Sequence, residues 1–288
     1  MSNNAISNAF VTIFESEVHQ AYQSEAKLAG TVRTRTNVEG STVKFPKLAK
    51  GSASVRSPGT QVTPVGAQFS SVTATMVDYS ASEYSDIFNQ AKVNFDERAE
   101  LAEMLGKAIA RREDQVVIDA LINASAGSTV ANTVVTSGSA GASDLNVGKI
   151  IEAGKKLNAK NVPATDRYLL VHANSMASLL GDERAVSSDF IQLDALRRGD
   201  VQAFGGFSII MFGDRDEGGI PIDGSSDRTC VAFHKSAIGL GVGMPAKTEI
   251  NYVPERTSFL VTAMYSAGAI AVDTDGICDV TCRESYDR

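Results

Sequence analysis

The chain has 288 residues, of which 43% are hydrophobic and 21% charged, and its formal net charge is -7. This composition supports roughly two globular domains and excludes a disordered chain. No apolar run approaches the ~18 residues of a membrane span, and the first residues lack a basic stretch before an apolar one, so we expect neither membrane insertion nor export. An acidic chain is also a poor candidate for a dedicated nucleic-acid binder, because phosphate binding needs a basic face.

The cysteines exclude two further classes of small structural site. Cys230, Cys278 and Cys282 are odd in number and do not form paired CxxC units, so neither a disulfide framework nor a zinc site is indicated. Synthesis in a reducing cytoplasm fits this usage. Cys278 and Cys282 would share one face of a strand, where buried small hydrophobic side chains are the favoured interpretation.

The first predicted element is a helix over residues 6–22, because apolar residues recur at helical spacing. The first 26 residues contain no Lys or Arg but do contain Glu15, Glu17 and Glu25. A helix lying in a membrane surface prefers basic residues on its polar face. We therefore expect this helix to pack against protein.

A basic segment follows, and it has little with which to build its own core. Between Lys27 and Val77 it carries one acid, Glu39, two aromatics and seven basic residues, which are Lys27, Arg33, Arg35, Lys44, Lys47, Lys50 and Arg56. Residues 41–48 and 69–77 read as strands, so we predict a β-hairpin that projects from the body and docks its basic surface on the acidic body of another copy. A merely solvated loop and a DNA contact remain as alternatives.

The strongest helix signal runs from Asn94 to Asn123, with Asn94 as N-cap and Glu97 completing a capping box. Its apolar stripe and its length of about 30 residues predict a rod of roughly 45 Å. Near its middle stand four charged residues, Arg111, Arg112, Glu113 and Asp114. We favour a solvated or subunit-facing surface for this cluster over buried acid/base chemistry.

The rest of the chain alternates helices and strands and then becomes mostly strands. A low-complexity connector over 124–142, with a short strand near 130–135, marks a domain boundary. Beyond it we predict helices at 144–158, 175–180 and 188–196 and strands at 168–171, 207–212 and 229–233. A succession of strands from Thr248 to Cys282 predicts an antiparallel sheet. The fold class is therefore α+β.

Motifs that carry chemistry are absent or weak. No GxSxG, Walker-type or HExxH motif occurs, and His19, His172 and His234 lie far apart, so each is interpreted as structural. The run GLGVG at Gly239, with no evident helix after it, reads as a close-packed strand or bulge in preference to a nucleotide site. The acidic stretch from Asp214 to Asp227 fails the spacing of a calcium-binding EF-hand and reads as a solvated turn.

Several segments, in this order, resemble the major capsid proteins of tailed bacteriophages, which have the Hong Kong 97-type fold that encapsulin shells share. They are NVEGSTVKFPKL in the basic segment, VTATMVDYSASEYSDIF before the long helix, ELAEMLGKAIARREDQVVIDAL within it, and then DRYLLVHANSMASLL, GDVQAFGGFSIIMF and FHKSAIGLGVGMPAKTEI. Together they cover most of the chain between Asn37 and Val280.

The resemblance implies a division of the chain into named parts. These are an N-terminal arm (1–29), an extended loop (30–78), a peripheral domain with a long spine helix (79–143), an axial domain (144–247) and C-terminal strands that return to the peripheral domain (248–288). Inter-subunit contacts are expected in the loop and on the spine, and the candidates are Arg33, Arg35, Lys44, Lys47, Arg56, Arg111, Arg112, Glu113 and Asp114.

The resemblance also implies a structural function without catalysis, metal or cofactor. Copies would form hexamers and pentamers of an icosahedral shell around non-specifically held double-stranded DNA, with portal, scaffolding and possibly decoration proteins as partners. The location would be the virion capsid, after assembly in the host bacterial cytoplasm. Two alternatives stay open, an encapsulin-type compartment that encloses cargo proteins and a nucleotide- or metal-dependent enzyme that uses GLGVG or the Asp-rich loop.

Overall fold

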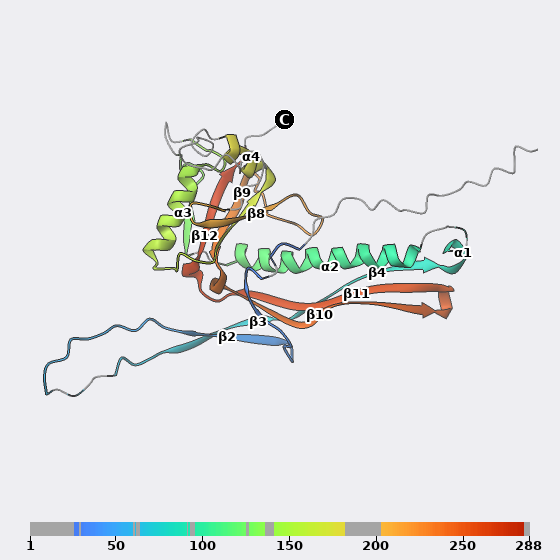
Figure 1. Ribbon diagram of the computed structural model, residues 1–288, viewed down its shortest axis with the longest axis horizontal. Coiled ribbons are helices and arrows are strands. Elements are labelled where there is room, and N and C mark those ends of the chain that lie inside the picture. Colours follow the sequence, from blue (N-terminus) through green and yellow to red (C-terminus); the bar gives the residue numbers. More distant parts are fainter. Residues whose placement is uncertain are drawn as a thin grey trace, which may run out of the picture.

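The computed structural model describes residues 26–28, 30–59, 61, 64–90, 92, 96–124, 127–135, 141–181 and 203–284. The helices expected at 6–22 and 188–196 lie outside these residues. Helices and strands form two main bodies and a projecting hairpin (Figure 1), which confirms the α+β class.

The first body is a long, thin sheet lined by one helix. Its strand order is β1 (Arg33–Arg35), β10 (Ile238–Val253), β11 (Ser258–Ala271) and β4 (Val77–Asp86), with β1 parallel to β10 and the other pairs antiparallel. The short helix α1 (Ile87–Gln90) stands at the far end, and α2 (Glu97–Ile122) runs back along the sheet (Figure 1). We call this body the peripheral body.

Helix α2 is the predicted spine, with a corrected start. Its N-cap is Asp96, whose side chain accepts a hydrogen bond from the Arg98 backbone N–H, and not Asn94. Asn94 lies outside the described residues, and the Glu97 carboxylate accepts a hydrogen bond from the Ser85 hydroxyl of β4 at 2.9 Å. The helix has 26 residues and is therefore about 39 Å long.

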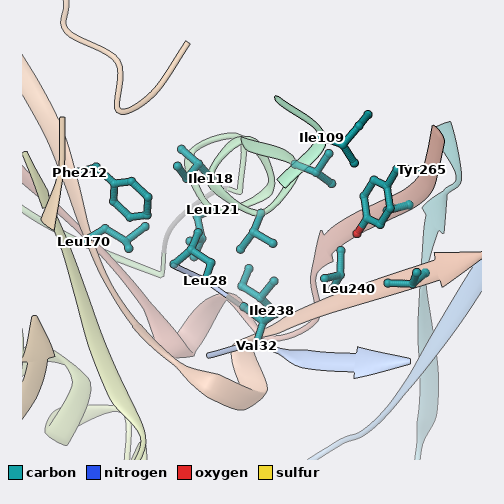
Figure 2. Packing of buried hydrophobic residues seen from close by; sticks show 14 of the residues in the cluster. Leu28, Val32, Ile109, Ile118, Leu121, Leu170, Phe212, Ile238, Leu240 and Tyr265 are labelled. Atoms are coloured by element: carbon teal, nitrogen blue, oxygen red, sulfur yellow. The ribbon is translucent and has the colours of Figure 1, made fainter. Parts of the chain in front are cut away.

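The apolar stripe of α2 builds the larger core (Figure 2). Leu105, Ile109, Val116 and Leu121 belong to this stripe and are buried in one cluster with side chains of β10 and β11. Leu28, close to the first described residue, is buried in the same cluster and is 1% exposed. Burial of this stripe stabilises a helix of modest intrinsic amphipathicity, since tertiary packing supplies most helical stability in proteins.

The second body is a six-stranded sheet covered by two helices, which we call the axial body. Its strand order is β5 (Ser128–Val130), β12 (Ile277–Arg283), β9 (Asp227–His234), β6 (Arg167–His172), β8 (Phe207–Phe212) and β7 (Ala203–Phe204). Helix α3 (Val147–Ala159) packs its apolar residues on this sheet, and α4 (Ala173–Gly181) follows β6 directly.

The third part is the hairpin of β2 (Thr42–Leu48) and β3 (Phe69–Thr75), which pairs only with itself. It projects beyond the rest of the subunit, away from the end where α1 lies (Figure 1). The described residues between 49 and 68 form no helix or strand. This is the projecting hairpin that the basic segment predicts, and we call it the extended hairpin.

Sheet membership corrects two of the expected domain boundaries. Strand β12 belongs to the axial sheet and does not return to the peripheral body, while β10 enters the peripheral sheet already at Ile238, inside the range 144–247 expected to be axial. The single-turn helix η4 (Thr274–Gly276), capped by Asp273, redirects the chain after β11. Alternation along β12 then buries Cys278, Val280 and Cys282 against α3.

Candidate assembly surfaces

The extended hairpin has one buried and one exposed face. Val43, Phe45 and Ala74 point toward the body and are at most 3% exposed. On the other face Lys44 is exposed, and the directly paired Leu48 and Phe69 are 56% and 78% exposed. An apolar pair left in solvent beside basic side chains is typical of a docking surface.

The basic candidates of the segment divide into two groups. Lys47 pairs with Asp273 of its own subunit at 2.9 Å, and both side chains are partly exposed. In contrast, Arg33, Arg35, Lys44 and Arg56 are exposed, and they form no ion pair within the described residues. These four side chains are therefore available to a neighbour, whereas Lys47 already has a partner.

The charged cluster on the spine is held mostly inside the subunit. Arg111 donates hydrogen bonds to both carboxylate oxygens of Glu217, at 2.9 and 3.1 Å. The Arg112 guanidinium lies over the Tyr79 ring, and burial raises the pKa of Glu113. Sequence reasoning missed these contacts, because the partners lie far away in the chain.

Asp114 is fully buried and holds two other segments of the chain. Its carboxylate accepts hydrogen bonds from the backbone N–H groups of Lys27 and Leu28, at 3.0 and 2.9 Å, and from the Arg215 guanidinium at 2.9 Å. Both charged side chains are 0% exposed. Asp114 therefore lies inside the subunit, which corrects its expected place among the inter-subunit contacts.

The far end of the peripheral body exposes a second group of large apolar side chains. Tyr84, Ile87 and Phe88 come from β4 and α1 at one edge of the sheet, and Ile250 and Tyr252 come from β10 at the other edge. By the strand register Tyr84 lies on the opposite face of the sheet from Ile250 and Tyr252. The same end carries the carboxylates of Glu83, Asp86, Asp96, Glu249 and Glu255. Asp96 pairs with Arg98 and Glu249 with Lys247, and the Arg256 guanidinium lies over the Tyr84 ring. We call the five apolar side chains together the distal patch. They lie at the end of the subunit opposite the extended hairpin (Figure 1).

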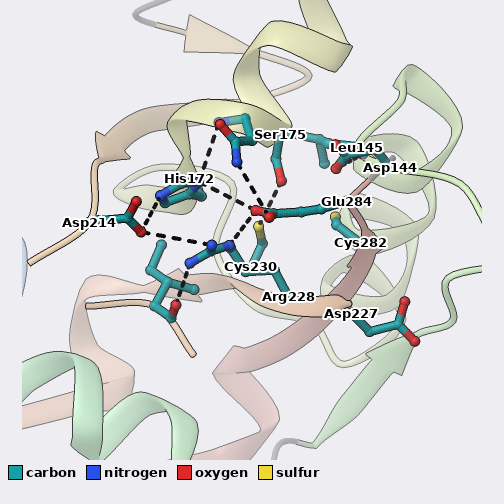
Figure 3. A network of polar contacts seen from close by, with 12 residues as sticks. Asp144, Leu145, His172, Ser175, Asp214, Asp227, Arg228, Cys230, Cys282 and Glu284 are labelled. Atoms are coloured by element: carbon teal, nitrogen blue, oxygen red, sulfur yellow. Dashed lines mark hydrogen bonds and ion pairs between the residues drawn. The ribbon is translucent and has the colours of Figure 1, made fainter. Parts of the chain in front are cut away.

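A polar network in the axial body groups His172 with charged side chains from several segments, as an active site would (Figure 3). The His172 ring lies 3.2 Å from Asp214 and 3.4 Å from Glu284, and Arg228 also binds Glu284. Burial, and then the nearby Arg228 charge, lower the pKa of His172. The network ties Glu284, which follows β12, to strands β6 and β9, and this supports a structural role for His172.

His234 also has a local structural contact. Its Nδ1 accepts a hydrogen bond from the Ser236 backbone N–H at 3.2 Å and thereby caps the turn after β9. His19 lies outside the described residues.

The acidic stretch and the cysteines have protein partners or are buried. Glu217 binds Arg111, Asp227 binds Arg283, and Asp223 accepts hydrogen bonds from backbone N–H groups. In the described part of the chain no three potential metal-binding side chains converge. The three cysteines are free and 0% exposed, as expected for buried small hydrophobic residues, and burial raises the pKa of Cys278 to about 12.

The GLGVG run lies within strand β10 and opens no helix. This confirms the expectation of a close-packed strand. No helix in the described ranges is both long and apolar enough to cross a membrane.

Comparison with known proteins identifies a single family. A family model described as phage capsid protein matches residues 6–284, which is nearly the whole chain. No curated protein gives a match.

Solved structures share the fold at low sequence identity. The head structure of Helicobacter pylori bacteriophage KHP40 has a TM-score of 0.78 and 12% identity, over 99% of this chain and 100% of the other. The capsid of cyanophage P-SCSP1u has a TM-score of 0.75 and 17% identity, over 97% and 94%. For Mycobacterium phage Che8 the TM-score is 0.71 and the identity 18%, over 95% and 97%.

Proposed function

Because this chain belongs to the phage capsid protein family and is a structural major capsid protein, we propose that its extended hairpin docks on the distal patch of a neighbouring copy. The family match over residues 6–284 carries the structural function. Repeated docking of this kind would join copies into the hexamers and pentamers of a closed icosahedral shell.

Charge and apolar surface support this pairing of ends. The hairpin offers Leu48 and Phe69 beside basic side chains. The distal patch offers Phe88, 66% exposed, and Tyr252, at an end with five carboxylates of which two are paired with Arg98 and Lys247. Opposite potentials orient two surfaces and fix their register, while the apolar side chains supply area removed from water. Each exposed ion pair contributes only ~0 to 1 kcal/mol, so repetition over many interfaces must supply the effect.

The proposed content of the shell is double-stranded DNA held without sequence preference. A subunit of net charge -7 does not grip phosphates strongly, which suits DNA that must enter and leave the shell. The portal, scaffolding and possible decoration proteins, and assembly in the cytoplasm of a bacterial host, belong to the same proposal. The virion capsid is the location that the family indicates.

The two alternatives are weaker than the capsid function. The match to the phage capsid family does not favour an encapsulin-type compartment. The family is also structural, and the two features that would have served an enzyme, GLGVG and the Asp-rich loop, form a strand and a set of intramolecular contacts.

The test reverses charges on the exposed face of the hairpin. Lys44→Glu combined with Arg56→Glu should leave a folded subunit by circular dichroism but abolish or deform the particles seen by negative-stain electron microscopy and light scattering. The matched control is Lys44→Arg with Arg56→Lys, which exchanges the side chains and keeps the charge. Normal shells from the reversed variant would refute docking through this face.

A further inference from the structure

Three glycines lie where the root of the extended hairpin meets the peripheral sheet. A Cβ atom on Gly239 would stand 2.8 Å from the Phe45 ring, and one on Gly241 would stand 2.6 Å from Cγ1 of Val43. On Gly268 it would meet the backbone oxygen of Thr75 at 2.1 Å. Side chains are therefore excluded at these points by the hairpin itself, because real Cβ atoms essentially never approach other atoms within 3.0 Å.

The hairpin fills the space that the glycines leave. Phe45 and Val43 are 1% and 3% exposed and form a separate apolar cluster with Ala74 and Val272. Just before β2, the Val38 backbone N–H donates to the Val242 carbonyl at 3.1 Å. These contacts thus join both strands of the hairpin, β2 and β3, to β10 and β11 of the peripheral sheet.

Ion pairs fix a further point along the hairpin. Lys47 binds Asp273 at 2.9 Å, and Lys50 binds Asp275 at 3.4 Å. Asp275 also accepts a hydrogen bond from Lys160 at 2.7 Å, which connects this point to the end of α3. Contacts at the glycines and at these two carboxylates are spread along the hairpin, so that rotation about any one of them breaks another.

We propose that Gly239, Gly241 and Gly268, together with Asp273 and Asp275, form a socket that sets the direction of the extended hairpin in the free subunit. The hairpin and the peripheral sheet then move as one body before any neighbour is met. A surface that is already oriented loses less conformational entropy when it docks. This last consequence rests on the proposed docking function, whereas the socket itself does not.

The experiment measures hydrogen exchange of the purified full-length subunit, kept dilute enough to stay unassembled. Gly241→Ala should speed exchange of the hairpin amides at residues 42–48 and 69–75 by about tenfold or more, since local opening sets their protection. Amides of β6 and α3 should keep their protection. Val43→Ala combined with Gly241→Ala removes the methyl group that the new Cβ meets, and it should restore slow exchange.

A matched control and a second socket variant separate the socket from general damage. Gly106→Ala lies in α2, where a Cβ meets nothing within 4 Å, and should change no hairpin amide. Asp273→Asn keeps an oxygen for the turn cap but removes the charge opposite Lys47, and should speed exchange of the amides near Lys47 only.

The outcomes are distinct for the socket and for docking. Unchanged hairpin exchange in Gly241→Ala, or failure of the double variant to restore it, would overturn the socket. If the hairpin amides exchange faster but the shells keep their normal yield and shape, the socket is supported. The idea that the socket assists assembly is then refuted. Failure of the unaltered chain to form shells would instead count against the proposed function, because the exchange result does not depend on assembly.

Discussion

The extended hairpin and the first described residues of the chain are both anchored on the subunit body, but by different kinds of interaction. Lys27 and Leu28 are held by Asp114, which is paired with Arg215, and both of those charged side chains are 0% exposed. The hairpin is held by apolar contacts at glycines and by ion pairs such as Lys47 with Asp273, whose side chains are 38% and 40% exposed.

The difference follows from the cost of burying charge. A buried carboxylate that loses its partner leaves an uncompensated charge. Breaking the contacts of Asp114 is therefore expected to cost much of the stability of the fold. Exposed pairs are screened by water and salt and contribute little individually. The hairpin therefore depends on shape for its direction, and its exposed face remains available to a neighbouring copy.

The largest effect is expected at the buried anchor. Asp114→Ala removes the buried carboxylate that binds the Arg215 guanidinium and the backbone N–H groups of Lys27 and Leu28, and it should lower the free energy of unfolding by about 3 to 5 kcal/mol. Denaturant unfolding followed by circular dichroism measures this loss. Glu103→Ala on the same helix, which removes a partly exposed pair with Lys107, is the control and should cost about 0.5 kcal/mol or less. Equal losses of unfolding free energy in the two variants would contradict the claim that the buried anchor contributes more than an exposed ion pair.

A smaller effect is expected at the apolar root of the hairpin. Phe45→Ala removes the largest side chain of the root cluster, and its cost should be about 3 kcal/mol or less, at the lower end for a buried Phe. The loss is limited because the hairpin can detach while the body stays folded. Hydrogen exchange should therefore show faster hairpin amides with little change in α2. Uniform acceleration across both regions would argue against separate anchoring.

The smallest effect is expected from acid. The hydrogen bond from Lys160, and then the one from Lys50, hold the pKa of Asp275 below its ordinary value of 3.8. The stability that Asp275 contributes is thus complete above that value and is lost as the pH falls through the lowered pKa of the folded state. Asp275→Asn should cost less than about 1 kcal/mol at pH 7, because the pair is partly exposed. Unfolding midpoints of the two proteins should converge once the pH has fallen below the lowered pKa of Asp275, and a difference that persists in that acid range would contradict this account.

Periodicity identified most elements of the fold, because local patterns report which face of an element is buried. The strand at 207–212 has the predicted ends, and the apolar stripe of the spine faces the core as expected. The start of the spine was misplaced at Asn94, since a cap depends on backbone geometry at one residue. The docking role of Arg33, Arg35, Lys44 and Arg56 stays a prediction.

Long-range partners could not be read from the chain. Nothing near Asp114 or Arg111 announces Arg215 or Glu217, which lie about a hundred positions later. The same holds for Gly239 and Gly241 of β10, which face the side chains of Phe45 and Val43 in a strand far away in the sequence. A side chain's neighbours are set by how elements pack, and that information is not local.

The sequence by itself determined the α+β class, the spine, the basic projecting hairpin and the resemblance to phage capsid proteins, because charge balance and apolar spacing are local properties of the chain. Only the tertiary structure decided that β12 joins the axial sheet, that Asp114 is buried and that glycines seat the hairpin. Each of these depends on atoms brought together from distant segments, where clearance and burial decide which contacts are possible.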